Sequence, residues 1–146
     1  MSHRLLFICT ANYYRSRYAE LLFNARAGEA RLDWEAFSRA VALEVGADNV
    51  GPISGHVISA LEAQGIRVAE PVRFPLALRE EELAQSDHVI ALNEAEHRPY
   101  LAERFPAWTD RVEYWHVPDL DARAATEGLA GIDREVRQLV QRLAGS

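Results

Sequence analysis

Short apolar runs alternate with amphipathic segments along most of the chain, and this alternation constrains the fold more than any other feature. The first run, Arg4–Cys9, is continuous and apolar, which is typical of a strand buried on both faces. Strand-like runs recur at Trp34–Leu43, Asp87–Leu92 and Arg111–Val117. Because helical patterns separate them, we predict an α/β fold in a single domain over residues 1–146. Its central four-stranded, mostly parallel sheet carries helices on both faces, giving three layers.

The segments between these strands carry helix signals. A helix begins near Ser16, another spans Ser54–Gly65, and shorter and final helices are predicted at Arg79–Ser86 and around Ile132–Leu143. Asn93 followed three residues later by Glu96 is the pattern of a capping box, which predicts a further helix start. Parallel sheets bind ligands beyond the carboxyl ends of their strands, so the residues after each strand are the first candidates for a site.

Composition narrows the function classes. The net charge of −6 argues against a nucleic-acid partner, and no apolar run approaches the roughly 20 residues of a membrane span. One cysteine cannot form an internal disulfide, which favours a reducing cytoplasm. All 16 basic residues are arginines, so a lysine Schiff base and a lysine-dependent Walker site are excluded. The five histidines are scattered, and we expect no metal and no cofactor.

The stretch "CTANYYRS" (Cys9–Ser16) joins the first predicted strand to the first predicted helix. If the five residues between Cys9 and Arg15 curl around one point, their N–H groups form an anion-binding nest beside a helix N-terminus. Arg15 then grips two oxygens of a tetrahedral oxyanion, and the same positive field favours the Cys9 thiolate. Ser16 is placed to donate to that thiolate, and Asn12 tolerates a left-handed backbone.

The alternative for this stretch is a small buried residue at the end of a strand, with a solvated arginine nearby. The position of Cys9 after a buried strand and before a helix favours the oxyanion site. Tyr13 and Tyr14 are either core residues or, where they point outward, walls for a flat aromatic substrate. Arg39 and Arg73 are candidates to border the site.

Several stretches of the chain together resemble the low-molecular-weight protein tyrosine phosphatases. The stretch around Cys9 looks like their C-x5-R-S phosphate loop, and "FSRAV" around Ser38 looks like their strand with a supporting serine. Similarity continues through "ISGHVISALEAQGI", "SDHVIALNEAEHRPYL" and "HVPDLD", in the right order and over nearly the whole chain.

The resemblance implies a role for each matching residue. Cys9 matches the nucleophile that forms a cysteinyl-phosphate, and Arg15 matches the residue that clamps phosphate. Asp119 matches the general acid, although Asp121 lies close enough to compete for that role. The loop and its support correspond to Thr10, Ala11, Asn12, Tyr13, Tyr14, Ser16 and Ser38.

The chain departs from the family pattern at several positions. Ala11 and Tyr14 stand where glycine and a second cysteine are common, and Arg17 and Leu120 stand where proline is common. The family's late tyrosine pair has no counterpart, and its histidine after the second helix has no clear match. Without the second cysteine, the family's protective disulfide cannot form.

Three functions follow from this pattern. The leading one is hydrolysis of phosphotyrosine-like monoesters, with a phosphorylated protein or a small aryl phosphate as partner. The second is arsenate reduction, which with one cysteine requires an external thiol. The third is a module that binds phosphotyrosine or another oxyanion without turnover. No nucleic acid or membrane partner is expected.

Overall fold

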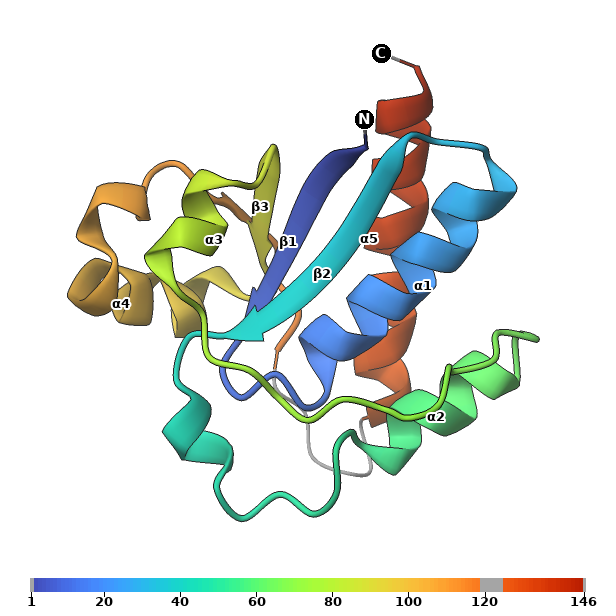
Figure 1. The fold of residues 1–146 in the computed structure, drawn as a ribbon, viewed down its shortest axis with the longest axis horizontal. Helices are drawn as coiled ribbons and strands as arrows, with labels where there is room; N and C mark the ends of the chain where they lie inside the picture. Colours follow the sequence, from blue (N-terminus) through green and yellow to red (C-terminus); the bar gives the residue numbers. More distant parts are fainter. Residues whose placement is uncertain (1, 119–124, 146) are drawn as a thin grey trace.

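A four-stranded parallel sheet forms the centre of the molecule. The computed structural model describes residues 2–118 and 125–145. Its strands run in the spatial order β2–β1–β3–β4 (Figure 1) and span β1 His3–Cys9, β2 Trp34–Ala40, β3 His88–Ala91 and β4 Glu113–Tyr114. Every neighbouring pair is parallel. The predicted α/β class and the parallel sheet are therefore confirmed.

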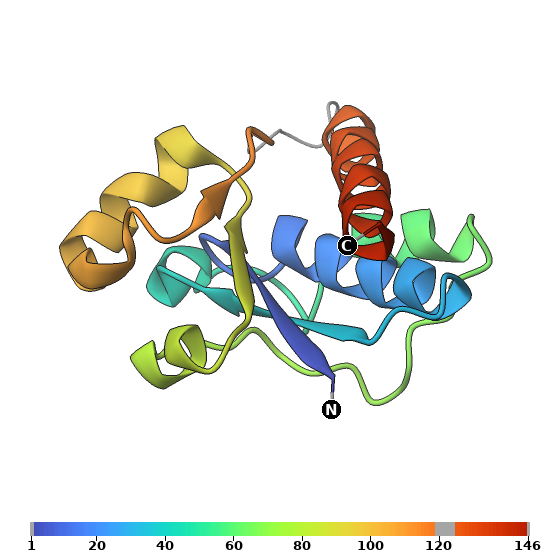
Figure 2. The same cartoon turned by 90° about the horizontal axis from the view of Figure 1, so that it is seen from above.

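Helices cover both faces of this sheet, as predicted (Figures 1 and 2). One layer consists of α1 Arg15–Glu29, α2 Gly55–Glu62 and α5 Ala125–Ala144, and the other of α3 Glu80–Ala84 and α4 Glu94–Arg104. Two short 3-10 turns complete the described elements, η1 Leu43–Gly46 and η2 Pro106–Trp108. None of the helices in the described part of the chain is long and apolar enough to cross a membrane.

The first strand shows why its sequence is apolar without interruption. Leu5, Phe7 and Cys9 pack against α1, α2 and α5, whereas Leu6 and Ile8 pack against α3 and α4. Side chains alternate between the two faces of a strand, and here both faces are covered. The strand therefore has no solvent-facing position near its end, and it delivers Cys9 to the carboxyl edge of the sheet from inside the core.

Two predicted strands are shorter than their sequence patterns. The second ends at Ala40, because its partner strand β1 ends at Cys9. The backbone N–H of Val41 still donates to the carbonyl of Cys9, but that of Ala42 donates to Thr10, which already belongs to the loop. The last run, Arg111–Val117, keeps only Glu113 and Tyr114 as a strand, since β3 offers just two register partners.

Two helices also differ in detail from the sequence pattern. The second helix spans Gly55–Glu62 rather than Ser54–Gly65, because Ser54 is its N-cap and accepts a hydrogen bond from the backbone of His56. Gly65 then adopts a φ of 77° in the turn that follows. The fourth helix continues through Pro99.

The tryptophans occupy core positions to different degrees. Trp115 is buried, whereas Trp34 and Trp108 are partly buried at the edges of the two hydrophobic clusters.

Candidate active site

The loop between Cys9 and Arg15 lies at the carboxyl edge of the sheet, where β1 ends and α1 begins. The hydrogen bonds from Val41 and Ala42 to Cys9 and Thr10 fix the start of this loop against the end of β2. A cavity of about 200 Å³ opens above it. The cavity is lined by Cys9, Thr10, Ala11, Tyr13, Tyr14, Arg15, Val45, Gly46 and Asn49.

The cysteine contacts a hydroxyl whose orientation is fixed from behind. The Cys9 sulfur lies 2.9 Å from Ser16 Oγ, and Asn12 Nδ2 donates to Ser16 Oγ over 2.8 Å. Because Ser16 accepts from Asn12, its own proton is available to point toward the sulfur. This arrangement stabilises a thiolate by charge-assisted hydrogen bonding. The predicted grouping of Cys9, Asn12 and Ser16 is therefore present in the structure.

Asn12 shapes the loop as well as the contact with Ser16. Its φ is 54°, the left-handed conformation that asparagine tolerates and that the sequence led us to expect. The side chain is fully buried and also donates to Ser38 Oγ over 2.9 Å. Ser38, on β2, is thus brought beneath the loop.

Two charged residues, Arg73 and Glu20, lie directly beneath the loop. Arg73 donates to Asn12 Oδ1 over 2.9 Å and to Ser38 Oγ over 3.0 Å, and it pairs with Glu20 at 3.2 Å. Ser38 Oγ donates to the same Glu20 carboxylate over 2.6 Å. Burial lowers the pKa of Arg73. The sequence offered Arg73 as a candidate to border the site, and the structure places it beneath the loop, in a segment without helix or strand periodicity. The sequence did not single out Glu20.

A second guanidinium under the loop, that of Arg17, is buried. It is 3% exposed, and it donates to the carbonyls of Pro52 and Arg73 over 2.9 Å each. Burial, and then the charge of Arg73, lower the pKa of Arg17 to about 10, so it stays positive at neutral pH. Two arginines and one carboxylate, Glu20, therefore leave a net positive charge beneath the loop.

Arg15 is not a solvated side chain. Its Nη1 and Nη2 donate to the two carboxylate oxygens of Glu96 over 3.1 and 2.6 Å, and Nη1 also donates to the carbonyl of Val117 over 3.0 Å. Thr10 donates its hydroxyl to the same carboxylate. Burial would raise the pKa of Glu96, but hydrogen bonds from His97, Arg15 and Thr10 outweigh it and hold the pKa far below its ordinary value.

The structure contains only one of the two hydrogen bonds of the predicted capping box. The Asn93 side chain accepts from the backbone N–H of Glu96 over 3.0 Å, as expected. The Glu96 carboxylate turns instead to Arg15, which is why the sequence pattern explained Glu96 as a helix cap and missed its contact with the loop.

The two tyrosines and Ala11 line the cavity from different directions. Tyr13 donates its hydroxyl to the carbonyl of Val50 over 2.7 Å, while Tyr14 packs partly against the core. Ala11 faces Gly46, where an added Cβ would lie only 2.6 Å from the Ala11 methyl. The methyl that Ala11 adds, compared with glycine, is therefore accommodated by its direct neighbour in space, Gly46.

Other candidates stand apart from the loop or outside the described residues. Arg39 pairs with Glu82 at 2.6 Å and reaches only the backbone of Ser38. Asp119 and Asp121 lie outside the described residues. Within residues 2–118 and 125–145, no group of three or more histidine, cysteine or acidic side chains is placed to hold a metal ion.

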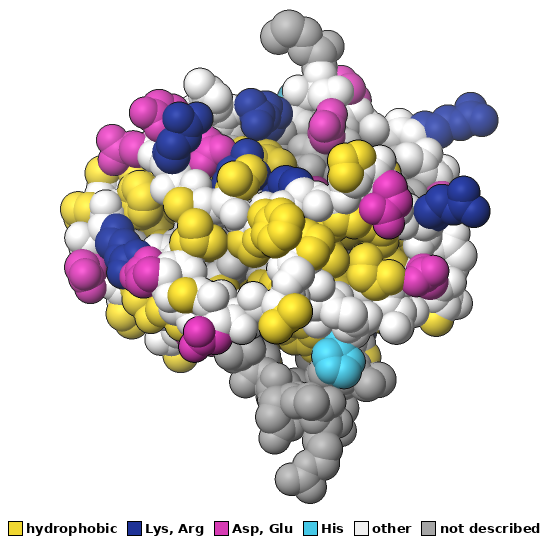
Figure 3. Space-filling model, turned by 60° about the horizontal axis from the view of Figure 1, so that its bottom comes forward, with side chains coloured by type: hydrophobic (Ala, Val, Ile, Leu, Met, Phe, Trp, Pro, Cys, Tyr) yellow, Lys and Arg dark blue, Asp and Glu magenta, His cyan; other side chains and the backbone are white. Residues whose placement is uncertain are grey.

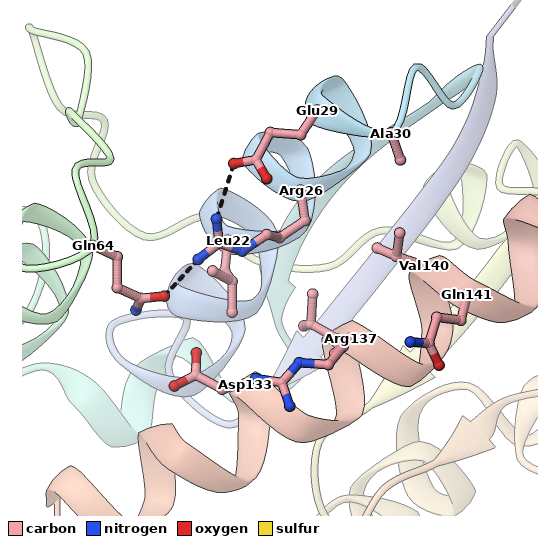
Figure 4. Close-up of a pocket in the computed structure, with 10 residues that line it drawn as sticks. Leu22, Arg26, Glu29, Ala30, Gln64, Asp133, Arg137, Val140 and Gln141 are labelled. Atoms are coloured by element: carbon pink, nitrogen blue, oxygen red, sulfur yellow. Dashed lines mark hydrogen bonds and ion pairs between the residues drawn. The ribbon is translucent and has the colours of Figure 1, made fainter.

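A larger cavity, of about 410 Å³, lies between α1 and α5 (Figure 4). Arg26 in this cavity donates to Glu29 and Gln64 over 2.9 and 2.7 Å, and the floor is formed by Leu22, Val136 and Val140. Among the described residues that line it there is no thiol or hydroxyl group. The chemistry of the side chains, rather than the size of the cavity, therefore assigns the site to the Cys9 loop.

Together the fold and this loop define a class of protein: an α/β protein whose thiol and guanidinium share one loop at the carboxyl edge of a parallel sheet. The sequence profile of the low molecular weight phosphotyrosine protein phosphatases matches residues 4–145, and the chain belongs to this family. The family membership predicted from the Cys9 stretch is thus confirmed, and the protein is a phosphatase of this type.

Solved structures show the same architecture. The low molecular weight protein tyrosine phosphatase from T. tengcongensis is 26% identical, with a TM-score of 0.80, and the match covers 97% of this chain and 99% of that one. The YwlE arginine phosphatase from Geobacillus stearothermophilus is 25% identical, with a TM-score of 0.72 and coverage of 98% and 91%.

A third structure shares the fold at lower identity. Vibrio vulnificus Wzb, solved in complex with benzylphosphonate, is 16% identical, with a TM-score of 0.80 and coverage of 97% and 99%. No curated protein matches the sequence of the chain.

Proposed function

We propose that the protein hydrolyses phosphate monoesters of the phosphotyrosine type through a thiophosphate intermediate on Cys9. The observation that carries this proposal is the single loop that holds the Cys9 sulfur 2.9 Å from Ser16 Oγ and ends at the buried guanidinium of Arg15. A thiolate and a bidentate cation on one loop are the groups that phosphoryl transfer to sulfur requires.

The reaction has two displacements. The Cys9 thiolate attacks phosphorus, the bond to the ester oxygen breaks, and Asp119 donates a proton to the leaving phenolate. Asp119, now a carboxylate, then takes a proton from water, whose oxygen attacks phosphorus and releases phosphate and the thiolate. Arg15 and the loop N–H groups stabilise the charge on the phosphoryl oxygens in both steps.

The residues at the rim of the cavity favour the proposal that the substrate is aromatic, either on a protein or as a small molecule. Tyr13, Tyr14 and Val45 line the cavity, and Val45 and Val50 are 60% and 82% exposed. Hydrophobic side chains gather on this face of the molecule (Figure 3). The large hydrophobic residues exposed in the described part of the chain are Val45, Val50, Phe74 and Leu76. A free thiol that must stay reduced suits the cytoplasm, which we propose as its location.

The test is steady-state hydrolysis of an aryl phosphate across pH. Cys9→Ser is expected to abolish turnover, and a wild-type rate in that variant contradicts the proposal. Asp119→Ala is expected to slow substrates with poor leaving groups by about 10²–10⁴-fold and good ones far less. Asp121→Ala is the matched control. If it shows the leaving-group effect instead, Asp121 is the acid.

The same preparation separates the alternative chemistries. Arsenate-dependent consumption of an added small thiol supports arsenate reduction, and no consumption with any tested thiol removes it. Tight binding of a phosphotyrosine peptide without phosphate release at any pH identifies a binding module and contradicts the hydrolase.

A further inference from the structure

We propose that Glu96 is a positioning residue for Arg15, and that Thr10 and His97 in turn hold Glu96. This inference rests on the proposed function, because Arg15 is the residue expected to clamp the phosphoryl group. Oxyanion binding then also depends on a carboxylate from α4, which contacts the loop on the side away from Asn12.

Glu96 fixes the plane of the guanidinium. The two carboxylate oxygens accept from Nη1 and Nη2 at once, and Val117 accepts a second bond from Nη1. An arginine side chain otherwise samples many rotamers, and a fork with two parallel bonds removes most of that freedom. Arg15 is 4% exposed and Glu96 28%, so the pair is shielded from the solvent that weakens surface ion pairs.

Glu96 is itself held on several sides. Thr10 Oγ1 donates to it, and His97 Nε2 lies 3.3 Å from Glu96 Oε2 and 3.1 Å from Thr10 Oγ1. The backbone N–H of Asn93 donates to His97 Nδ1, which places the proton of a neutral His97 ring on Nε2, facing the pair. Glu96 also lies in the first turn of α4, where the helix dipole favours a carboxylate.

The geometry makes Glu96 an aid to oxyanion binding rather than a competitor for it. A guanidinium offers two forks, one between its two Nη atoms and one along its Nε–Nη edge. Glu96 takes the first fork. An oxyanion seated over Cys9 can then be gripped along the second edge while the carboxylate keeps the plane aligned, as a backing group does for a preorganised donor.

The experiment compares two neutralised glutamates on the same turn of α4. Glu96→Gln removes the charge but keeps the size of the side chain. Glu94→Gln is the matched control, because Glu94 is 39% exposed and pairs with Arg98 instead of the loop. Tungstate affinity is measured by calorimetry on the intact protein, and kcat and KM are measured separately with an aryl phosphate.

We expect Glu96→Gln to weaken tungstate binding at least tenfold and to lower kcat more than it raises KM. The conservative variant Glu96→Asp should recover part of this loss, and Glu94→Gln should change affinity less than twofold. If Glu96→Gln does not fold, Thr10→Val gives the same test by removing one support of the carboxylate, with an expected loss of a few-fold in affinity.

Two results overturn the positioning role. Unchanged tungstate affinity with a lower melting temperature makes Glu96 a purely structural residue, and tighter tungstate binding makes it a competitor for Arg15. Failure of the proposed function is visible separately. If wild type hydrolyses no monoester but binds tungstate in a Glu96-dependent way, the hydrolase is wrong and the positioning role stands.

Discussion

The two sides of the loop between Cys9 and Arg15 are held in different ways. On one side, buried amide and hydroxyl groups of Asn12, Ser16 and Ser38 form a chain that ends on Arg73 and Glu20. On the other side, a single carboxylate, Glu96, joins Arg15 to Thr10 and α4. The first side fixes the backbone and the hydroxyl beside sulfur, whereas the second fixes the direction of one side chain.

This difference matters for how each side responds to change. Neutral hydrogen bonds are each worth about 1 kcal/mol but fail together when a shared partner is lost. An ion pair with several hydrogen bonds depends on charge, so a neutral residue of equal size is enough to disturb it. The predictions below probe these two responses, beginning with the largest effect.

Asn12→Ala tests the side that shapes the backbone. Alanine loses the bonds to Ser16, Ser38 and Arg73 and must adopt a φ of 54°, which it disfavours. We expect kcat/KM to fall by about 100-fold, as a displaced reacting group would cause, and the free energy of unfolding to fall by about 2–4 kcal/mol.

The control for this prediction is Asn24→Ala. The Asn24 side chain lies away from the loop. Its Nδ2 donates to the carbonyl of Ala36, and its Oδ1 accepts from the backbone N–H of Ala36. Asn24→Ala should lower the free energy of unfolding measured by urea titration while leaving kcat/KM near the wild-type value. Equal losses of activity in the two variants would mean that the Asn12 side acts through general stability alone.

Arg73→Met asks whether the charge beneath the loop supports the thiolate. Methionine removes a guanidinium that contacts Asn12, Ser38 and Glu20. Glu20 and Arg17 are then the two charged residues that remain beneath the loop. Alkylation of Cys9 by iodoacetamide at pH 7 should become several-fold slower, because less thiolate is present. Arg67→Met, an exposed arginine in the same segment, should react like wild type. A wild-type alkylation rate in Arg73→Met would restrict Arg73 to packing.

Glu113 is a hydrogen-bonded carboxylate that lies away from the loop, and it serves as a comparison for Glu96. Hydrogen bonds from His88, Trp115 and Arg142 lower the pKa of Glu113 to about 2, against the effect of its burial. A lowered pKa stabilises the fold above the unfolded value near 4.5, and this stability is lost as the pH falls from there toward 2. About 1–2 kcal/mol should disappear over that range.

Acid titration of the unfolding free energy measures this contribution. Glu113→Gln should flatten the slope between pH 4.5 and 2 and keep hydrolysis at neutral pH unchanged, whereas Glu96→Gln should lose activity. An equal loss of activity in both variants would remove the distinction between a structural and a positioning carboxylate.

The sequence predicted the parts of the fold that repeat a pattern. The uninterrupted apolar run before Cys9 indicated a strand covered on both faces, and Leu5 through Ile8 are fully buried. Strand ends were less predictable, because β2 ends where its neighbour β1 gives way to the loop, and Ala42 bonds to Thr10 of that loop. Such a change of partner leaves no trace in hydrophobic spacing.

The residues of the candidate site also differ in how well the sequence predicted them. Asn12 and Ser16 lie within a few residues of Cys9, so loop chemistry was enough to place them, and the family pattern added Ser38. Arg73 and Glu96 come from distant segments, and only the fold brings them to the loop. Glu96 was also concealed by a capping pattern that is genuine, since its backbone does bond to Asn93.

The close approach of Ala11 and Gly46 also limits how the sequence can change. A side chain at position 46 would meet the Ala11 methyl at 2.6 Å, so these two neighbouring positions in the cavity lining are coupled. Substitutions at the pair are expected to be non-additive. Bulk can be moved from position 11 to position 46 only if the Asn49 amide also shifts, because its Nδ2 would lie 2.7 Å from the added Cβ. Reshaping this cavity, by evolution or by design, therefore involves Ala11→Gly and a new place for the Asn49 side chain before any enlargement of Gly46.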